Sequence, residues 1–304
     1  MANAKQSIAT PGAEAIQVKG WLGAHKWLIL RRISQFGILF LFLLGPWFDL
    51  WLVKGNLASS LTLDVLPLTD PYVLLQTLVA GMLPISTAFL GAAIVLGFYM
   101  IVGGRSYCSW VCPVNLVTDL ASWLRRKLNI KGSGVAIDKN TRYWMLGATL
   151  VVAMLSGSLA WELINPVSMM HRGIIFGMGF AWAVIFAVFI FDLFISKHGW
   201  CGRLCPVGAF YSLPGKLSVV RVTADKRAQC DDCMDCFVVC PEPQVIRPAL
   251  KGEAKGIGPV IMAEHCTNCG RCIDVCAEDV FHYATRFANQ APKNAPKPAP
   301  PVAG

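Results

Sequence analysis

Eight cysteines in the last quarter of the chain repeat one spacing twice. The sequence reads CDDCMDCFVVC from Cys230 and CTNCGRCIDVC from Cys266, so each run is C-x2-C-x2-C-x3-C. Three thiolates in a tight loop can occupy three corners of a cubane iron–sulfur cluster, and a cysteine from elsewhere must then close the fourth corner. The pattern therefore predicts two [4Fe–4S] clusters and a function in electron transfer.

Two other kinds of cysteine site explain this pattern less well. A zinc site takes four ligands, usually from two C-x2-C pairs, whereas eight cysteines in two identical runs exceed that need. A disulfide framework is typical of small secreted domains, and this segment carries no export signal of its own. Iron–sulfur clusters are the interpretation that uses all eight thiols.

The two runs resemble those of bacterial ferredoxins, in which the fourth cysteine of each run binds the other cluster. The resemblance implies two ligand sets, which are Cys230, Cys233, Cys236 and Cys276 for the first cluster and Cys266, Cys269, Cys272 and Cys240 for the second. Pro241 after Cys240 matches the ferredoxin pattern, whereas Ala277 stands where the second proline would be. We expect a small α+β ferredoxin-like domain over residues 223–288.

The remainder of the chain has the composition of a membrane protein. Of its 304 residues 55% are hydrophobic and 15% charged, and the mean hydropathy is +0.53. The apolar residues form long blocks, which predict membrane helices. All twelve cysteines belong to motifs, which favours thiols kept reduced in the cytosol until metal arrives.

The net charge of +9 does not indicate nucleic-acid binding, because the basic residues flank apolar blocks and form no stripe with aromatic residues. We predict a mainly α membrane protein with four spans, at residues 33–53, 84–102, 143–161 and 174–195. Residues 73–83 precede Pro84 and are expected to lie at the interface or to re-enter the membrane.

Basic residues alternate along the chain in a way that predicts its orientation. Lys and Arg number five before the first span, then one, seven and one in the three loops, and six more between Lys197 and Arg227. The positive-inside rule then places both termini and the ferredoxin segment in the cytoplasm of a bacterium, around a multi-pass inner-membrane protein. The pair Arg31-Arg32 also matches a twin-arginine export signal, but no cleavage site follows the long apolar run.

A second set of cysteines marks an internal repeat. The second span leads into GRSYCSWVCPVN and the fourth into KHGWCGRLCPVG, two C-x3-C-P motifs offset by 93 residues. The chain therefore reads as two copies of a helix pair. If the motifs face each other, Cys108, Cys112, Cys201 and Cys205 form a four-thiol site. Three interpretations stay open for it: a third iron–sulfur cluster, a single metal ion, or redox-active thiols that dock a partner.

These motifs divide the chain into seven segments. The expected boundaries are a cytoplasmic N-terminal segment (1–32), a first transmembrane helix pair (33–104), a cytoplasmic loop with the first C-x3-C-P (105–142), a second helix pair (143–197), the second C-x3-C-P with a linker (198–222), the ferredoxin-like domain (223–288) and a disordered Ala/Pro/Lys tail (289–304).

Together with GPWFDLW, PLTDP and INPVSMMHRG, these motifs resemble the NapH family, the membrane iron–sulfur subunits of periplasmic nitrate reductase systems, over nearly the whole chain. The resemblance implies oxidation of menaquinol or ubiquinol from the membrane quinone pool. It also implies electron transfer to a NapG-like periplasmic iron–sulfur partner and onward to the nitrate-reducing subunits. Nitrate and a molybdenum cofactor are not expected to bind here.

Quinol oxidation releases two protons as well as two electrons. Candidate groups on the non-cytoplasmic side are Glu162 and His171 as proton acceptors and Asn165 and Arg172 as hydrogen-bond partners of a quinone; Asp49 lies on the same side. We expect no haem, because there is no C-x-x-C-H motif and all five histidines lie outside the spans.

The clusters and the partner fall on opposite sides of the membrane in this scheme, across a gap of ~30 Å. A competing hypothesis is a membrane polyferredoxin that acts as a redox maturation or assembly factor for a metalloenzyme. A third is a purely structural membrane anchor, for which eight ferredoxin cysteines would serve no purpose.

Overall fold

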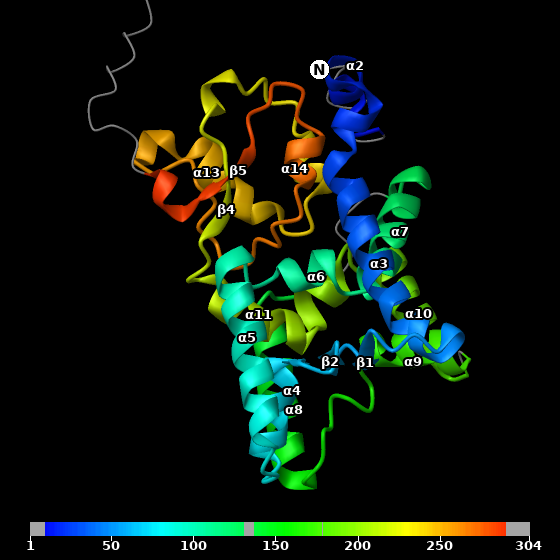
Figure 1. The fold of residues 1–304 in the computed structure, drawn as a ribbon. Coiled ribbons are helices and arrows are strands. Elements are labelled where there is room, and N and C mark those ends of the chain that lie inside the picture. The colour runs from blue at the N-terminus through cyan, green and yellow to red at the C-terminus, as the bar shows by residue number, and fades with distance from the viewer. Residues whose placement is uncertain (1–9, 131–136, 178, 290–304) are drawn as a thin grey trace, which may run out of the picture.

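A computed structural model describes residues 10–130, 137–177 and 179–289. The described chain is mainly helical, with the C-terminal ferredoxin-like domain stacked on one end of a helical body (Figure 1). Residues 1–9 of the predicted N-terminal segment and 290–304 of the predicted tail lie outside the described residues.

Two consecutive helices, α2 (Ala13–Ala24) and α3 (Lys26–Phe48), begin the described chain. With His25 between them they cover 36 residues, and the most apolar stretch has a mean hydropathy of 1.7. The segment Ala13–Phe48 is therefore long and apolar enough to cross a membrane. The prediction that the first span runs to residue 53 is wrong. Helix α3 ends at Phe48, because Asp49 takes a left-handed conformation (φ 58°) that caps it.

The loop predicted at residues 54–72 contains an antiparallel sheet of three short strands, β1 (Val53–Gly55), β2 (Ser59–Thr62) and β3 (Leu66–Thr69). Strand β3 packs against helix α5 (Ser86–Val102). A Cβ atom at Gly91 of α5 would lie 3.0 Å from the amide nitrogen of Thr69, so a glycine is needed at this approach. The loop therefore folds back onto the helices.

The other apolar helices are shorter than a full membrane crossing. In the described residues, Ala13–Phe48 alone is both long and apolar enough, whereas the next apolar helices are Ser86–Val102 and Ala181–Ile195. A helix of 17 residues is about 25 Å long, compared with a hydrocarbon thickness of ~30 Å. Four spans therefore stay a prediction.

The remaining helices of the body also differ from the predicted boundaries. They are α4 (Pro71–Val79), α6 (Ser106–Trp110), α7 (Val114–Lys127), α8 (Thr141–Ser156), α9 (Pro166–Phe176), α10 (Ala181–Ile190) and α11 (Pro206–Gly215), with π-helical turns at Phe191–Ile195 (η1) and Trp200–Leu204 (η2). One continuous helix over 174–195 is a wrong prediction, because Gly177 (φ 97°) separates α9 from α10. Likewise α8 ends at Gly157 (φ 60°), before Trp161.

The helices pack in two groups that exchange elements between the sequence repeats. Helix α11, which follows the second C-x3-C-P motif, packs on α5 of the first repeat, and α7, which follows the first motif, packs on α10 of the second. Figure 1 shows the two groups, with α4, α5, α8 and α11 on one side and α3, α7, α9 and α10 on the other. This exchange places both motifs at the centre, beneath the ferredoxin-like domain.

The ferredoxin-like domain is a small α+β unit, as expected. Its antiparallel strands are β4 (Val220–Thr223) and β5 (His282–Thr285), its helices α12 (Asp235–Val239), α13 (Ile246–Lys251) and α14 (Arg271–Asp274), and its 3-10 turns Arg227–Gln229, Pro243–Val245, Glu253–Lys255 and Arg286–Asn289. Val222, Ile246 and Phe281 lie in its apolar core. Cysteine side chains take much of the remaining interior of this domain.

The N-terminal helices are fastened to the ferredoxin-like domain. The carboxylate of Asp274 in α14 accepts hydrogen bonds from the backbone amides of Trp27 (3.0 Å) and Leu28 (2.9 Å) in the first turn of α3. It thus caps α3 from another part of the chain. The amide of Gly12 donates to Asp235 of α12 (2.7 Å) in the same way.

We expect Asp274→Ala to lower the stability of this contact. Loss of a side-chain cap costs about 1 kcal/mol, so the variant should unfold at a lower temperature in detergent and be cleaved faster at α2 by a protease. Glu253→Ala is the control, because Glu253 is the exposed partner of Arg227 within the ferredoxin-like domain. Equal behaviour of the two variants would contradict the proposed cap.

Candidate iron–sulfur centres

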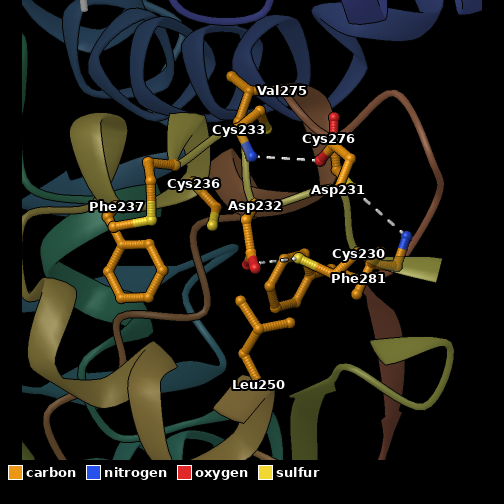
Figure 2. A pocket seen from close by; sticks show the side chains of 12 residues that line it. Cys230, Asp231, Asp232, Cys233, Cys236, Phe237, Leu250, Val275, Cys276 and Phe281 are labelled. Carbon is orange, nitrogen blue, oxygen red and sulfur yellow. Dashed lines mark hydrogen bonds between the residues drawn. The ribbon is translucent and has the colours of Figure 1, made fainter. Parts of the chain in front are cut away.

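The first cubane set (Cys230, Cys233, Cys236 and Cys276) surrounds a single pocket (Figure 2). Its loop turns tightly because Asp232 (φ 62°) and Met234 (φ 67°) adopt left-handed conformations. The amide of Cys233 donates to Asp231 Oδ1 (3.3 Å), and the sulfur of Cys276 accepts from the amide of Val280 (3.4 Å). The structure thus brings together the four cysteines of the first predicted ligand set.

The second cubane set (Cys266, Cys269, Cys272 and Cys240) repeats this geometry. Its left-handed residues, Asn268 (φ 46°) and Gly270 (φ 73°), occupy the same places in the motif as those of the first loop. Burial and the neighbouring Cys269 and Cys266 thiols raise the pKa of Cys240. For Cys269 burial acts in the same direction, but the guanidinium groups of Arg271 and Arg31 outweigh it and lower the pKa. Arginines therefore favour the thiolate form here.

The repeat thiol site (Cys108, Cys112, Cys201 and Cys205) lies where the two sequence repeats exchange helices. Each of the six pairs among these thiols interacts electrostatically. Cys108 lies on the five-residue helix α6 and Cys201 on the π-helical turn η2, whereas Cys112 and Cys205 follow these elements, each directly before a proline that stands at the start of the next helix. The two pairs of cysteines thus face one another.

A bridge of three buried charged residues connects this site to the ferredoxin-like domain. In this Arg–Glu–Arg bridge, Glu242 Oε1 accepts from Nη1 of Arg105 (2.8 Å) and from Nη1 of Arg142 (3.1 Å). The three side chains are at most 2% exposed. Burial alone would raise the pKa of Glu242, but the two guanidinium groups outweigh it and lower the pKa to about 2. Glu242 is therefore ionised.

The repeat thiol site adjoins the second cubane set. One cavity is lined by Cys108 and Cys201 on one side and by Pro241, Glu242, Thr267 and Arg271 on the other. Pro241 follows Cys240, and Thr267 follows Cys266. The Ser109 hydroxyl donates to the Thr267 carbonyl (2.7 Å), which fixes α6 against the cluster-binding loop. The first cubane set contributes no residue to this cavity.

The donor set at the repeat thiol site suits an iron–sulfur cluster better than a single ion. A tetrahedral ion would draw its sulfurs to about 3.8 Å apart, and among the described residues no three His, Cys, Asp or Glu side chains converge on one ion position. Three buried N–H groups, Arg105 Nε, Arg142 Nε and Arg142 Nη2, have no partner within the described chain. Sulfur atoms of a cluster are acceptors for such donors.

The redox-thiol interpretation is less well supported by the surroundings of these four cysteines. Burial raises the pKa of Cys108, Cys112, Cys201 and Cys205. For Cys205 the value reaches about 12. Thiols that exchange disulfides have lowered pKa values instead. A bound metal deprotonates such thiols directly, so a metal-binding role is compatible with their burial.

All four predicted quinol-site residues lie on α9 or just before it. Asn165 caps α9 by accepting from the amide of Val167 (3.1 Å), and its amide group donates to Glu162 (3.1 Å). Ser168 also donates to Glu162. His171 is 3% exposed, packs edge-on against Phe42 of α3, and has no hydrogen-bond partner for either ring nitrogen in the described chain.

The other two polar candidates on that side of the chain stand apart from this network. Arg172 follows His171 on α9, but its side chain is exposed. Asp49 ends α3 and accepts a hydrogen bond from the indole of Trp51 (2.7 Å). Neither is held near the carboxylate of Glu162 by a contact that would build a binding site.

Asp70 and a group of tyrosines were missed by the sequence analysis. Asp70 caps α4 through the amide of Tyr72 (2.9 Å) and accepts from the hydroxyl of Tyr211 (3.0 Å). The ring of Tyr211 stacks on Tyr107, whose neighbour in the chain is Cys108. Burial raises the pKa of Asp70 to about 6. The only sequence signal was the motif PLTDP, which by itself assigns no chemistry to Asp70.

Comparison with known proteins identifies the family. A family model described as "4Fe-4S binding domain" matches residues 86–131 and again 178–223, and one described as "4Fe-4S dicluster domain" matches 229–280. The chain is 47% identical to the ferredoxin-type protein NapH of Escherichia coli, over 96% of this chain and 99% of that protein. The chain belongs to the family of NapH and MauN ferredoxin-type proteins.

Within this family two groups are similarly related to the chain. The methylamine utilization ferredoxin-type protein MauN is 50% identical in Methylorubrum extorquens (94% of this chain, 98% of that protein) and 52% in Paracoccus denitrificans (88% and 94%). No solved structure matches. The chain is thus an iron–sulfur electron-transport protein, and each match of the first family model contains one C-x3-C-P motif.

We expect about twelve iron atoms per chain in anaerobically purified protein, because three cubanes hold four each. Cys108→Ser or Cys201→Ser should lower the count to about eight and leave the ferredoxin-type EPR signals intact. Cys233→Ser is the matched comparison, since it should change those EPR signals instead. Eight iron atoms in the unaltered chain would contradict a cluster at the repeat thiol site.

Proposed function

We propose that this chain is a membrane-bound quinol dehydrogenase subunit, which takes electrons from menaquinol or ubiquinol and passes them to an iron–sulfur partner. The observation that carries the proposal is the position of the repeat thiol site. Two of its thiols, Cys108 and Cys201, line one cavity together with Pro241 and Thr267, which are the chain neighbours of Cys240 and Cys266 in the second cubane set. Redox centres at these places would form a continuous series from the helices to the ferredoxin-like domain.

The proposed orientation is that of a multi-pass protein of the bacterial inner membrane with both termini in the cytoplasm. The alternation of basic residues supports it, as does the long apolar helix Ala13–Phe48. The shorter apolar helices would cross with the help of the folded-back sheet β1–β3 and of interfacial residues. The seven segments proposed from the sequence follow from this orientation.

Each iron–sulfur cluster, when bound, accepts and releases one electron. In this proposal the two ferredoxin-type clusters are held by the first and second cubane sets, and a third is held by the repeat thiol site. The protein's own residues bury the thiolates, supply arginines that compensate their charge, and hold the loops together through Glu242 and Ser109. Quinol oxidation to quinone releases two electrons and two protons, and clusters held at these sites would take up the electrons one at a time.

Those protons need acceptors near the quinol, for which the chain offers two polar groups. The first lies at α9, where Glu162 accepts from Asn165 before the helix begins, and where the buried His171 and the exposed Arg172 lie on the helix itself. Asp70, bonded to Tyr211, is the second and lies nearer the repeat thiols. Strand β3 of the folded-back sheet leads directly into Asp70. We propose that quinol binds between these two groups.

The electron acceptor in this proposal is a NapG-like periplasmic iron–sulfur protein that serves periplasmic nitrate reductase subunits. NapH relatives at 46–47% identity support this pathway. The MauN relatives, at similar identity, support electron transfer in methylamine utilization equally well. The chain's own role, passing electrons between the membrane and an iron–sulfur partner, is the same in both.

A redox maturation factor is the second candidate function, because the names of these ferredoxin-type relatives state no electron donor or acceptor. Such a protein would use its clusters to reduce a bound metal or disulfide in a partner. Replacing Cys108 or Cys201 would then impair maturation of the partner, and quinol would not reduce the clusters at a saturable rate.

We expect a menaquinol analogue to reduce the clusters of the anaerobic protein in detergent at a rate that saturates with quinol. His171→Gln should slow this reduction by about 10²-fold, since a positioned proton acceptor contributes at least that much, while dithionite reduces the variant fully. The control is His25→Gln. His25 stands at the start of α3, whereas His171 packs against Phe42 near the other end of that helix. Clusters that quinol leaves oxidised in the unaltered chain would support the maturation hypothesis instead.

A further inference from the structure

The Arg–Glu–Arg bridge lies where four cluster-binding loops meet. Arg105 is three residues before Cys108, and besides Glu242 it donates to the carbonyl oxygens of Cys201 (2.9 Å) and His265 (3.1 Å). His265 directly precedes Cys266, and Glu242 follows Cys240 by two residues. One guanidinium therefore joins both C-x3-C-P motifs to both chain segments of the second cubane set.

Stability alone does not explain such a bridge. Burying ions costs desolvation energy that their mutual attraction often fails to recover, and well-packed apolar residues of similar size are frequently as stable. The bridge is fully enclosed, and N–H groups of both arginines have no acceptor within the described chain. We infer from these features that the bridge acts electrostatically on a neighbouring group.

The neighbouring groups are thiols of both sites. Arg105 interacts electrostatically with Cys108, Cys201 and Cys205 of the repeat thiol site and with Cys266 of the second cubane set. Arg142 interacts with Cys108 as well. Two guanidinium groups and one carboxylate give the bridge a net charge of +1. A buried positive charge stabilises a reduced cluster, which carries one electron more, and so raises its potential.

We propose that the Arg–Glu–Arg bridge is a positioning and potential-setting element that holds the repeat thiol site beside the second cubane set and raises the reduction potentials of the clusters at both. The part that concerns the repeat thiol site rests on the function proposed above, whereas the part that concerns the second cubane set does not. Electrons pass between the two sites across this bridge.

Other cations face the second cubane set from different elements. Arg221 of β4 interacts with Cys266, and Arg271 of α14 with Cys269 and Cys240. Unlike Arg105, neither donates a hydrogen bond to a C-x3-C-P motif among the described residues, although Arg271 lines the cavity that also contains Cys108 and Cys201. Substitutions within the bridge should therefore shift the reduction potentials of the clusters at both sites. A substitution at Arg221 should shift only that of the second cubane set.

The test is a redox titration of the full chain in detergent, followed by EPR, with iron counted on each sample. Glu242→Gln leaves the bridge at +2 and should raise the potential of the second-set cluster. Arg142→Gln leaves it neutral and should lower that potential. Each shift should be about one tenfold step in the reduction equilibrium, which is 59 mV for one electron. Arg142→Lys keeps the charge and should stay near the unaltered value.

Lys54→Gln, which removes a cation from an exposed ion pair in the sheet, is the control and should change no potential. The proposal would be overturned if the potential shifted in the same direction in Glu242→Gln and Arg142→Gln, or in neither. It would also be overturned if Arg142→Lys shifted the potential as much as Arg142→Gln does. If Glu242→Gln loses its second-set cluster, the comparison of Arg142→Gln, which should lower the potential, with Arg142→Lys, which should leave it unchanged, decides the matter.

The iron count separates this proposal from the function proposed above. Eight iron atoms per unaltered chain would remove the cluster from the repeat thiol site, yet the potential of the second-set cluster would still test the bridge. Twelve iron atoms with no charge-dependent shift would overturn the bridge and leave the proposed function standing.

Discussion

The structure depends on how it compensates thiols that are buried away from water. A thiolate in a low-dielectric interior needs a positive charge or hydrogen-bond donors nearby. Buried arginines supply that charge where the helical body meets the ferredoxin-like domain. Arg271 and Arg31 favour the thiolate of Cys269, and Arg105 and Arg142 favour that of Cys108. The two parts of the molecule are thus joined by the groups that their cysteines require.

This arrangement gives several basic residues a second role. Arg31 and Arg32 both pair with Asp119 of α7, which also binds Arg271 beside Cys272. Read as a sequence, the Arg31-Arg32 pair marks the cytoplasmic end of a membrane helix. In the fold it also connects α3, α7 and the ferredoxin-like domain. A count of basic residues for topology therefore includes cations whose neighbours are thiols and carboxylates inside the protein.

The sequence predicted what depends on spacing. The two cubane sets, the repeated C-x3-C-P motif and the α+β ferredoxin-like domain all follow from cysteine positions along the chain. It did not predict what depends on three-dimensional packing. Glu242 reads as an ordinary surface residue after Pro241, and its role appears only when Arg105 and Arg142, 137 and 100 residues away in sequence, converge on it. Asp70 likewise acquires its partner Tyr211 only when the loop folds back.

We propose that the repeat thiol site holds a third redox centre beside the second cubane set. Its most direct test is the EPR spectrum of the fully reduced protein compared with that of Cys201→Ser. We predict extra magnetic coupling in the unaltered chain, beyond that of the two ferredoxin-type clusters, and its loss in the variant with those two clusters retained. Identical spectra from the two proteins would contradict the account.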